Sequence, residues 1–217
     1  MCYGRRALAK PRTTLLSIHP EHPEPHRIGQ AVAHLEAGRV IVYPTDTLYG
    51  LAADIENRTA IERLYSLRRL DPNKPLSLIC RDLSQVAHYA IMSDECYRFM
   101  KRALPGPYTF ILKATREAPR MGQNRRRAVG IRVPASPVAQ ALVEALGRPV
   151  LSTSAAGLDE AAVNDPVELA GLYGPRDVAL ILDAGLLFGT PSTVVDWSQD
   201  EPELVRQGAG DVADLFD

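Results

Sequence analysis

The sequence predicts an α/β fold in which a twisted, open, mixed sheet with flanking helices forms a single domain. Segments with helical spacing alternate with short runs rich in β-branched residues, as in layered α/β proteins. Strand pairs near residues 108–133 and 179–206 have no helix between them, so we expect some antiparallel pairing and a mixed sheet. The 217 residues, 46% of them hydrophobic, suffice for one core.

The beginning of the chain is expected to be extended. Residues 1–13 are basic and lack periodicity, so we interpret them as an N-terminal extension whose order the sequence leaves open. Residues 14–217 then form the domain. Segment 19–26 is too rich in proline for a helix, and its histidines match no known spacing of metal ligands, so no metal site is predicted.

Two helices are expected in the first third of the domain. Residues 27–37 carry apolar side chains at helical spacing, and Gly38 follows as a stop signal. Thr59 and Glu62 have the spacing of a capping box, which predicts a second helix over residues 59–68.

Four further helices follow. A short one is expected after Leu83, and a longer one over residues 94–103, before the proline and glycine residues of segment 105–107. Ser136 and Pro137 form a cap and a first turn, so a helix should run from there to Gly147. Asp165 caps the last helix, which ends near Gly174.

The strands are expected where β-branched and apolar residues cluster between these helices. Their positions are residues 40–43, 76–80, 108–114, 129–133, 150–154, 179–183, 193–197 and 204–206. The run at 40–43 leads into a polar loop at 45–50, and the run at 150–154 likewise opens into hydroxyl-bearing residues.

Composition indicates a cytoplasmic protein without a membrane anchor. The three cysteines are odd in number and form no CxxC pair, which is typical of a reducing compartment. No apolar run reaches the roughly 18 residues of a membrane span, and the N-terminus has no signal-peptide core.

The formal net charge of −1 conceals a basic region. Ten cationic residues stand against Glu117 alone between residues 98 and 132. They are Arg98, Lys101, Arg102, Lys113, Arg116, Arg120, Arg125, Arg126, Arg127 and Arg132. This region can attract anions, although a solvated basic face would have the same composition.

The common nucleotide-binding and hydrolase signatures are absent, and the histidines beyond the lead-in stand far from any serine or cysteine loop. What remains is a set of hydroxyls at strand ends together with arginines. The set comprises Thr45, Thr47, Ser152, Ser154, Ser192, Thr193, Arg68, Arg69, Arg132 and Arg206. Hydroxyls and guanidinium groups bind phosphate and carboxylate oxygens, so the recurrence of these residues indicates an anion-binding site at the strand ends, although any single serine or threonine more often forms a turn or a helix cap.

Five segments resemble motifs of the YrdC/YciO family, and they occur in the family's order. They read VYPTDTLYGL at 42–51, PGPYTFILK at 105–113, VGIRVP at 129–134, PSTVVD at 191–196 and VRQGAG at 205–210. The resemblance covers residues 15–216 and implies the YrdC/RibB-like fold with a concave basic pocket. Segment 78–83 and the arginine-rich turn before Val129 look most like the YciO branch.

The resemblance implies a threonylcarbamoyl-AMP synthase-like nucleotidyltransferase. Members of the family join L-threonine, bicarbonate or CO2 and ATP, and the adenylate serves tRNA threonylcarbamoyladenosine modification. Matching positions imply that Thr45, Arg132, Ser152 and Ser192 hold the amino acid and its carbamate. Positions that meet the nucleotide match Arg68, Ser154 and Arg206, with Arg68 and Arg132 as the catalytic cations. Mg²⁺ would bridge phosphates without a dedicated protein site.

Binding of double-stranded RNA or tRNA is also implied by relatives, and Arg125, Arg126 and Arg127 are the residues we expect to contact it. A mobile, solvated loop is the alternative interpretation of that turn.

Three departures from the family pattern predict weak synthase activity. Arg68-Arg69-Leu70 stands for Lys-x-Arg, Ser152-Thr153-Ser154 for Ser-x-Asn, and Ala128 for a threonine. A missing guanidinium removes a charge-assisted bond of about 1.5–3 kcal/mol. The alternatives are an RNA-binding YciO-like protein without full activity, and a related carbamoyl transferase or hydrolase.

Overall fold

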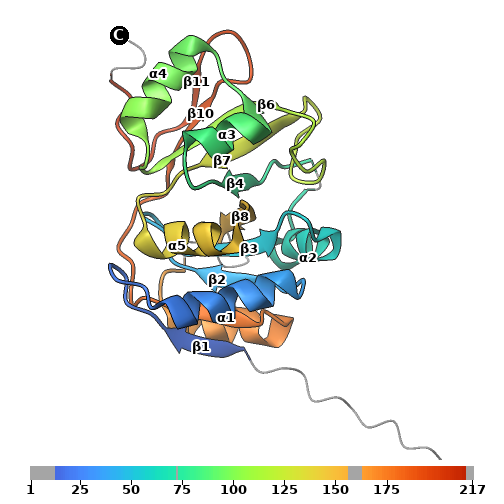
Figure 1. Cartoon of the computed structure of the whole chain (residues 1–217), viewed down its shortest axis with the longest axis vertical. Helices are drawn as coiled ribbons and strands as arrows, with labels where there is room; N and C mark the ends of the chain where they lie inside the picture. The colour runs from blue at the N-terminus through green and yellow to red at the C-terminus, as the bar shows by residue number, and fades with distance from the viewer. Residues whose placement is uncertain (1–12, 72, 156–162, 214–217) are drawn as a thin grey trace, which may run out of the picture.

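A mixed sheet of eleven strands runs the length of the molecule in the computed structural model, which describes residues 13–71, 73–155 and 163–213 (Figure 1). The strands are β1 (Thr14–Ser17), β2 (Ile41–Tyr43), β3 (Gly50–Asp54), β4 (Ser77–Ile79), β5 (Ala90–Ile91), β6 (Tyr108–Ala114), β7 (Ala128–Arg132), β8 (Val150–Ser154), β9 (Leu180–Asp183), β10 (Thr193–Asp196) and β11 (Glu203–Arg206). Their order is β1-β9-β2-β3-β8-β4-β7-β6-β10-β11, and β5 pairs with β6.

The predicted mixed sheet is confirmed by the pairing of its strands. β6 pairs antiparallel with β7 and β10 antiparallel with β11, as expected from their adjacency in the sequence. β9 and β10 are also neighbours in the sequence but lie apart in the sheet, because β9 pairs in parallel with β1 and β2 while β10 pairs in parallel with β6.

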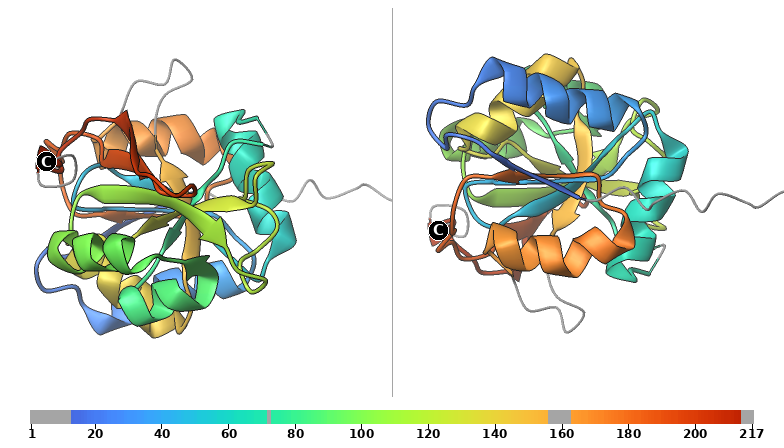
Figure 2. Two further views of the ribbon diagram at one scale, coloured as in Figure 1. Left: turned by 90° about the horizontal axis from the view of Figure 1, so that it is seen from above. Right: turned by 90° about the horizontal axis from the view of Figure 1, so that it is seen from below.

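Six α-helices cover the sheet in the described part of the chain: α1 (Pro25–Glu36), α2 (Arg58–Arg68), α3 (Leu83–Tyr89), α4 (Asp94–Ala103), α5 (Pro137–Leu146) and α6 (Pro166–Tyr173). Viewed from below, α1 and α5 lie on one side of the sheet and α6 on the other (Figure 2). The packing agrees, since one apolar cluster joins α1 and α5 to Ile41, Tyr43 and Val150. A second cluster joins α2, α3, α4 and α6 to the opposite face.

Most helix boundaries follow the local signals. The Ser136 hydroxyl accepts a hydrogen bond from Ala139 N at 3.4 Å, and Gly147 closes α5 with a φ of 74°. Asp165 caps α6, and α4 has the predicted bounds. None of the helices in the described ranges is both long and apolar enough to cross a bilayer.

Two helix starts differ from the prediction. α2 is capped by Asn57, whose side-chain oxygen accepts a hydrogen bond from Ala60 N at 2.9 Å, so the predicted capping box at Thr59 is wrong. α1 begins at Pro25 rather than at residue 27, because proline lacks the N–H that the first turn leaves unpaired and is well suited there.

Three strands were not expected from the sequence. β1 is part of what looked like an extended lead-in, and it is a strand only because it pairs with β9, 163 or more residues away along the chain. β3 is rich in glycine and alanine, and gains its place between β2 and β8. β5 is only two residues long.

The predicted boundary between the N-terminal extension and the domain lies at residue 13. Residues 1–12 are outside the described part of the chain, and the Thr13 hydroxyl donates to Val178 O at 2.6 Å.

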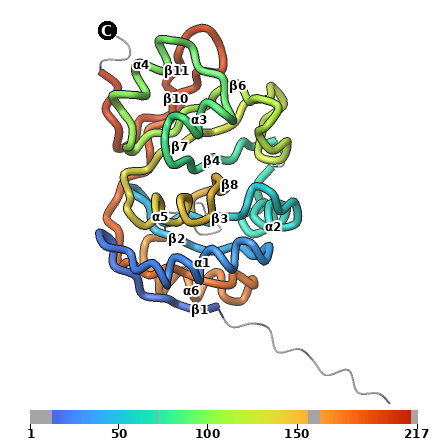
Figure 3. Tube along the Cα trace, in the orientation of Figure 1, coloured from blue at the N-terminus to red at the C-terminus, as the bar shows by residue number. Residues whose placement is uncertain are grey.

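Residues 184–192 link β9 to β10 and connect the two halves of the sheet along one side of the molecule (Figure 3). The Tyr49 hydroxyl holds the start of this segment, accepting from Ala184 N at 3.0 Å and donating to Gly185 O at 2.7 Å. A side chain at Gly189 would collide with Thr47 O, so glycine permits the close approach. The segment therefore brings Ser192 to the loop that follows β2.

Candidate functional site

One face of the central sheet carries a row of small and polar residues. The strand register aligns Gly50 with Ser154, Ser152 with Ser77, and Ser77 with Gly130 across β3, β8, β4 and β7. Ile111 lies opposite Gly130, and Val194 lies opposite Thr109, which extends the row to β10. Because side chains alternate between faces along a strand, all these residues share the face that α1 and α5 cover further along the sheet.

A cavity of about 490 Å³ lies on this face. Eight of the ten residues that the sequence singled out line it together, and Arg69 and Thr193 do not. The eight are Thr45, Thr47, Arg68, Arg132, Ser152, Ser154, Ser192 and Arg206. Most of these residues lie at the ends of strands, where the sequence placed them. Arg132, Ser154 and Arg206 are the last residues of β7, β8 and β11, and Thr45 and Ser192 flank strands, whereas Ser152 lies inside β8.

The charge of the cavity wall is of one sign. Arg68, Lys74, Arg132 and Arg206 line it, and among the described residues no aspartate, glutamate, histidine or cysteine does. The remaining polar side chains of the wall are hydroxyls. Such a wall presents hydrogen-bond donors and positive charge, which is the complement of carboxylate and phosphate oxygens.

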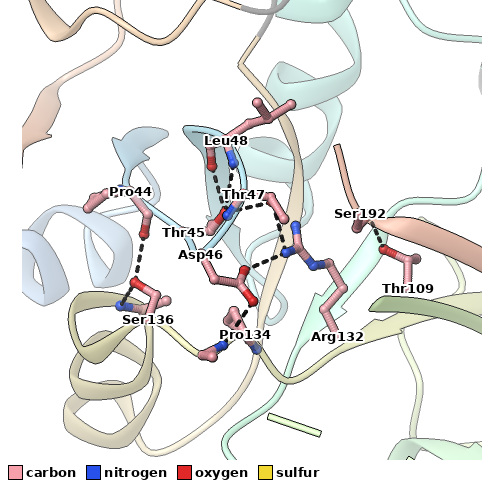
Figure 4. Close-up of polar contacts among 12 residues, drawn as sticks. Pro44, Thr45, Asp46, Thr47, Leu48, Thr109, Arg132, Pro134, Ser136 and Ser192 are labelled. Carbon is pink, nitrogen blue, oxygen red and sulfur yellow. Dashed lines mark hydrogen bonds and ion pairs between the residues drawn. The ribbon is translucent and has the colours of Figure 1, made fainter. Parts of the chain in front are cut away.

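The loop after β2 is organised by the hydroxyl of Thr45 (Figure 4). Thr45 Oγ1 donates to Leu48 O at 2.6 Å and accepts from the backbone amides of Thr47 and Leu48, each at 3.2 Å. It also lies 3.1 Å from Thr47 Oγ1. The proton of Thr45 is thus committed within the loop, so this residue shapes the wall of the cavity.

Arg132 is held by a carboxylate on the loop (Figure 4). Its Nη2 donates to Asp46 Oδ1 at 2.8 Å and to Thr47 Oγ1 at 3.0 Å, while Asp46 Oδ2 accepts from Ala135 N at 3.0 Å. The side chains of Arg132 and Asp46 are 13% and 9% exposed. The Nε of Arg132 is buried and has no hydrogen-bond partner within the described ranges.

Arg206 is held by neutral groups. Its Nε and Nη2 donate to Ser192 O at 3.1 and 2.7 Å, and Nη2 also approaches Ser192 Oγ at 3.3 Å. Ser192 Oγ in turn lies 2.9 Å from Thr109 Oγ1. Partial burial, and then the nearby charge of Arg132, lower the pKa of Arg206 below its usual value. A bound anion would relieve this repulsion.

The opposite wall combines the end of α2 with the loop before β4. Arg68 is the last residue of α2, and Lys74 is placed by hydrogen bonds of its backbone, with Lys74 N donating to Asp71 O and Tyr65 Oη donating to Lys74 O at 2.9 Å. Ser154 ends β8 beside them in the wall. The cavity wall thus takes cations from α2 and the loop before β4 as well as from β7 and β11.

Arg125, Arg126 and Arg127 are exposed and are not part of the cavity wall. Asn124 organises their turn, because its side-chain oxygen accepts from Arg126 N at 2.9 Å and from Ala128 N at 3.0 Å. Arg125 Nε donates to Asn73 Oδ1 at 3.2 Å, which ties the turn to the loop that carries Lys74. These hydrogen bonds organise the backbone of the turn, and the side chains of its three arginines are exposed to solvent.

Several residues of the site were missed. Lys74 could have been found from its position shortly after Arg68, but Asp46 and Thr109 carry no local signal, because their partners Arg132 and Ser192 are 86 and 83 residues away. Three positions, Leu70, Ala128 and Ser154, depart from the family pattern. Leu70 packs against the apolar core and Ala128 is fully buried, so only Ser154 of the three lines the cavity.

Neither thiol of the described chain is available for covalent chemistry. Cys80 and Cys96 are both buried, and burial raises the pKa of each thiol. Within the same residues no three His, Cys, Asp or Glu side chains converge as metal ligands. The chemistry of the donors that are present suits anions, not a protein-bound cation.

Comparison with known proteins gives a consistent result. A family model named Sua5_yciO_yrdC, described as "Telomere recombination", matches residues 33–208. The uncharacterized protein YciO of Escherichia coli K12 is 45% identical over 197 residues, which are 90% of this chain and 95% of that protein. A threonylcarbamoyl-AMP synthase of Halorhodospira halophila is 34% identical over 75% of this chain and 85% of its own length.

Two solved structures have the same fold. The crystal structure of E. coli YciO matches with a TM-score of 0.88 and 43% identity, covering 94% of this chain and 99% of that one. The structure of P. abyssi Sua5 complexed with L-threonine matches with a TM-score of 0.84 and 27% identity, over 90% of this chain and 58% of that longer chain.

Proposed function

Because the chain belongs to the Sua5/YciO/YrdC family, we propose that it is a threonylcarbamoyl-AMP synthase-like enzyme, which forms an acyl-adenylate from L-threonine, bicarbonate or CO2, and ATP for tRNA threonylcarbamoyladenosine modification. The observation that carries the proposal is the single cavity in which four cations and several hydroxyl groups meet without any carboxylate in the described wall. Three substrates of this reaction bear anionic oxygens.

The reaction requires no nucleophile from the protein. The threonine amine adds to CO2 and loses a proton, which gives a carbamate. A carbamate oxygen then attacks the α-phosphorus of ATP, the bond from that phosphorus to the bridging oxygen breaks, and pyrophosphate leaves. The buried, protonated thiols and the lack of a cavity-lining histidine among the described residues agree with such a mechanism.

The protein's contribution is to hold mutually repelling anions together. Fixing reactants in a near-attack geometry contributes about 7–11 kcal/mol. Arg132 and Arg206 lie close enough to interact, and we assign Arg132, Ser152 and Ser192 to the amino acid and its carbamate. Arg68, Ser154 and Arg206 are assigned to the nucleotide, and Lys74 joins them. Thr45 is assigned to the wall of the amino-acid site, where it holds the loop.

Mg²⁺ fits this arrangement as an ion that arrives with ATP. In proteins Mg²⁺ usually keeps several of its waters and is bound by substrate phosphates together with at most one or two carboxylates. Bound to ATP, it would neutralise part of the charge of the phosphates. The described cavity wall offers cations and hydroxyls, so we propose no dedicated metal site.

The proposal is tested by mass spectrometry of reactions that contain ATP, Mg²⁺, bicarbonate and single amino acids. We expect an adenylate of the mass of threonylcarbamoyl-AMP, formed only when threonine and bicarbonate are both present. Arg132→Ala should abolish it, whereas Arg58→Ala, which removes a solvent-exposed arginine from the start of α2, should not. If the folded protein neither forms an adenylate nor binds ATP and threonine at millimolar concentration, the proposal is wrong.

A second candidate function, binding of double-stranded RNA or tRNA, is favoured by the turn at residues 124–127. Its three exposed arginines are presented by a hydrogen-bonded turn outside the cavity, where a phosphate backbone could reach them. Such binding should need no ATP and should weaken steeply with salt, because counterions are released. Replacement of all three arginines by alanine should then reduce the salt dependence, and affinity that does not change with salt would exclude this function.

A further inference from the structure

A tyrosine behind the cavity sets the hydrogen-bond direction of one of its hydroxyls. Tyr43, on β2, is fully buried, and its hydroxyl lies 2.8 Å from Ser152 Oγ on β8. Burial raises the pKa of Tyr43 to about 12, so the phenol keeps its proton at neutral pH and must donate it. Ser152 Oγ is the partner that the described residues provide for that proton.

The opposite direction of this bond is unfavourable. If Ser152 donated to the phenol oxygen, the Tyr43 proton would be buried without an acceptor, which costs about 1–3 kcal/mol. A serine hydroxyl has one proton and two acceptor sites. With one acceptor site of Ser152 occupied by Tyr43, its own proton is left for the other side, where Ser152 lines the cavity.

The backbone between the two residues is built for this contact. Tyr43 lies opposite Gly50 on β3, and Ser152 lies opposite Ala52, so the phenol reaches Ser152 diagonally across the glycine. A Cβ at Gly50 would stand 2.8 Å from Tyr43 Cε1 and 3.1 Å from Ser152 Oγ. The absence of a side chain at position 50 is therefore what lets the ring cross β3.

We propose that Tyr43 is a positioning residue: by donating to Ser152 Oγ it directs the Ser152 proton toward the cavity, where that proton can be donated to an anionic oxygen of the substrate. This inference rests on the proposed function for the identity of the substrate. A carboxylate or carbamate oxygen can accept this proton, whereas an ammonium group has no lone pair with which to accept it. Phosphate has the same acceptor chemistry, so the experiment has to separate the two.

Binding of L-threonine, L-threoninol and pyrophosphate is to be measured by calorimetry for the wild type and for Tyr43→Phe. Threoninol carries a hydroxyl in place of the carboxylate. We expect Tyr43→Phe to weaken threonine binding about fivefold to tenfold, to weaken threoninol less, and to leave pyrophosphate unchanged. A loss confined to pyrophosphate would place a phosphate at Ser152 and overturn the assignment to the carboxylate.

Two further variants separate positioning from a general loss of stability. Ser152→Ala should lose at least as much threonine affinity as Tyr43→Phe, and the double variant should lose no more than Ser152→Ala, because Tyr43 acts only through Ser152. Tyr173→Phe removes the hydroxyl of another fully buried tyrosine, on α6 and outside the cavity wall, and should leave threonine binding unchanged. Additive losses in the double variant would contradict the inference.

A neutron structure of the deuterated protein tests the direction without any ligand. We expect the deuteron of the pair on Tyr43 Oη and the deuteron of Ser152 pointing into the cavity. The reverse arrangement would overturn the inference even if threonine binds. If threonine does not bind at all, the proposed function is at fault, and the neutron map still decides the direction of the bond.

Discussion

Hydrogen-bond direction at single residues determines which hydroxyls of the cavity can donate to a ligand. Thr45 donates its proton to Leu48 O, whereas Ser152 accepts a hydrogen bond from Tyr43, so its own proton is not used in that bond. Arg132 donates through Nη2 to Asp46 Oδ1, and its buried Nε has no partner among the residues that the structure describes. Residue types alone do not distinguish these cases, because threonine and serine carry the same functional group.

Asp46→Asn should destabilise the protein by about 3 kcal/mol, because it leaves the largely buried guanidinium of Arg132 without its charge partner. The measurement is urea unfolding at neutral pH. The double variant Asp46→Asn, Arg132→Met should recover part of the loss, since both charges are then gone. A single variant as stable as the wild type would show that the Arg132–Asp46 pair contributes little.

Arg206→Ala should weaken ATP binding at least about tenfold, which corresponds to the loss of one charge-assisted hydrogen bond. The ATP affinity of Arg206→Lys should lie between those of the wild type and Arg206→Ala, since lysine keeps the charge but cannot form the two hydrogen bonds that Nε and Nη2 donate to Ser192 O. Arg58→Ala changes the net charge equally at an exposed position and serves as the control for calorimetry. Equal ATP affinity in the wild type and in all three variants would show that Arg206 does not contact the nucleotide.

At the scale of single elements, side-chain caps determine where most helices begin, and the sequence predicted two of these caps, Ser136 and Asp165. Ser136, Asp82, Ser93 and Asp165 each accept a hydrogen bond from an amide of the first turn of the helix that follows. These contacts span two or three residues, so they can be found without knowledge of the fold. α2 is the exception, because its sequence predicted a cap at Thr59 and the structure has the cap two residues earlier, at Asn57.

Asn57→Ala should lower the free energy of unfolding by about 1 kcal/mol, through the loss of the hydrogen bond from Ala60 N. Thr59→Ala, at an exposed position inside the first turn, should change it by less than about 0.5 kcal/mol. Asn57→Ser keeps an acceptor and should stay near the wild type. The comparison is made by thermal or urea unfolding. A larger loss of unfolding free energy in Thr59→Ala than in Asn57→Ala would support the capping box at Thr59 instead.

At the scale of the whole molecule, the sheet combines its two halves into one binding face. Residues 184–192 carry the chain from β9 to β10, and the contacts of this segment with Tyr49 and Thr47 bring Ser192 to the loop that follows β2 (Figure 3). The small residues Gly50, Ser77 and Gly130 then leave room above the sheet. The cavity is thus a property of strand register, not of any one motif.

The burial of Tyr43 makes stability sensitive to alkaline pH. Its pKa is raised from the ordinary value of 10 to about 12, so the neutral form is favoured in the folded state. This contribution is fully present below pH 10 and is lost as the pH rises from 10 towards 12, at about 1.4 kcal/mol per pH unit.

Unfolding measured between these pH values should therefore show a smaller loss in Tyr43→Phe than in the wild type. Tyr97→Phe, at a tyrosine that is 42% exposed on α4, is the matched control and should keep the loss of the wild type. Equal pH dependence in all three proteins would show that the Tyr43 phenol ionises as readily in the folded as in the unfolded chain.

The sequence by itself determined the α/β class, most of the helices with two of their caps, and the arginines and hydroxyls that meet in the cavity. These features depend on residues close together in the chain, so spacing and side-chain chemistry predict them. β1 and β3 were beyond its reach, since a strand without a strong local pattern is stabilised by the partners it pairs with.

Only the tertiary structure decided which partner each site residue has. The pairs Asp46 with Arg132, Tyr43 with Ser152 and Thr109 with Ser192 join residues 83 to 109 positions apart in the chain. Their contacts follow from the register of neighbouring strands and from the long connection at residues 184–192, and neither leaves a local trace. The cavity's donor character arises from these pairs, because a hydroxyl donates or accepts according to the neighbour that folding gives it.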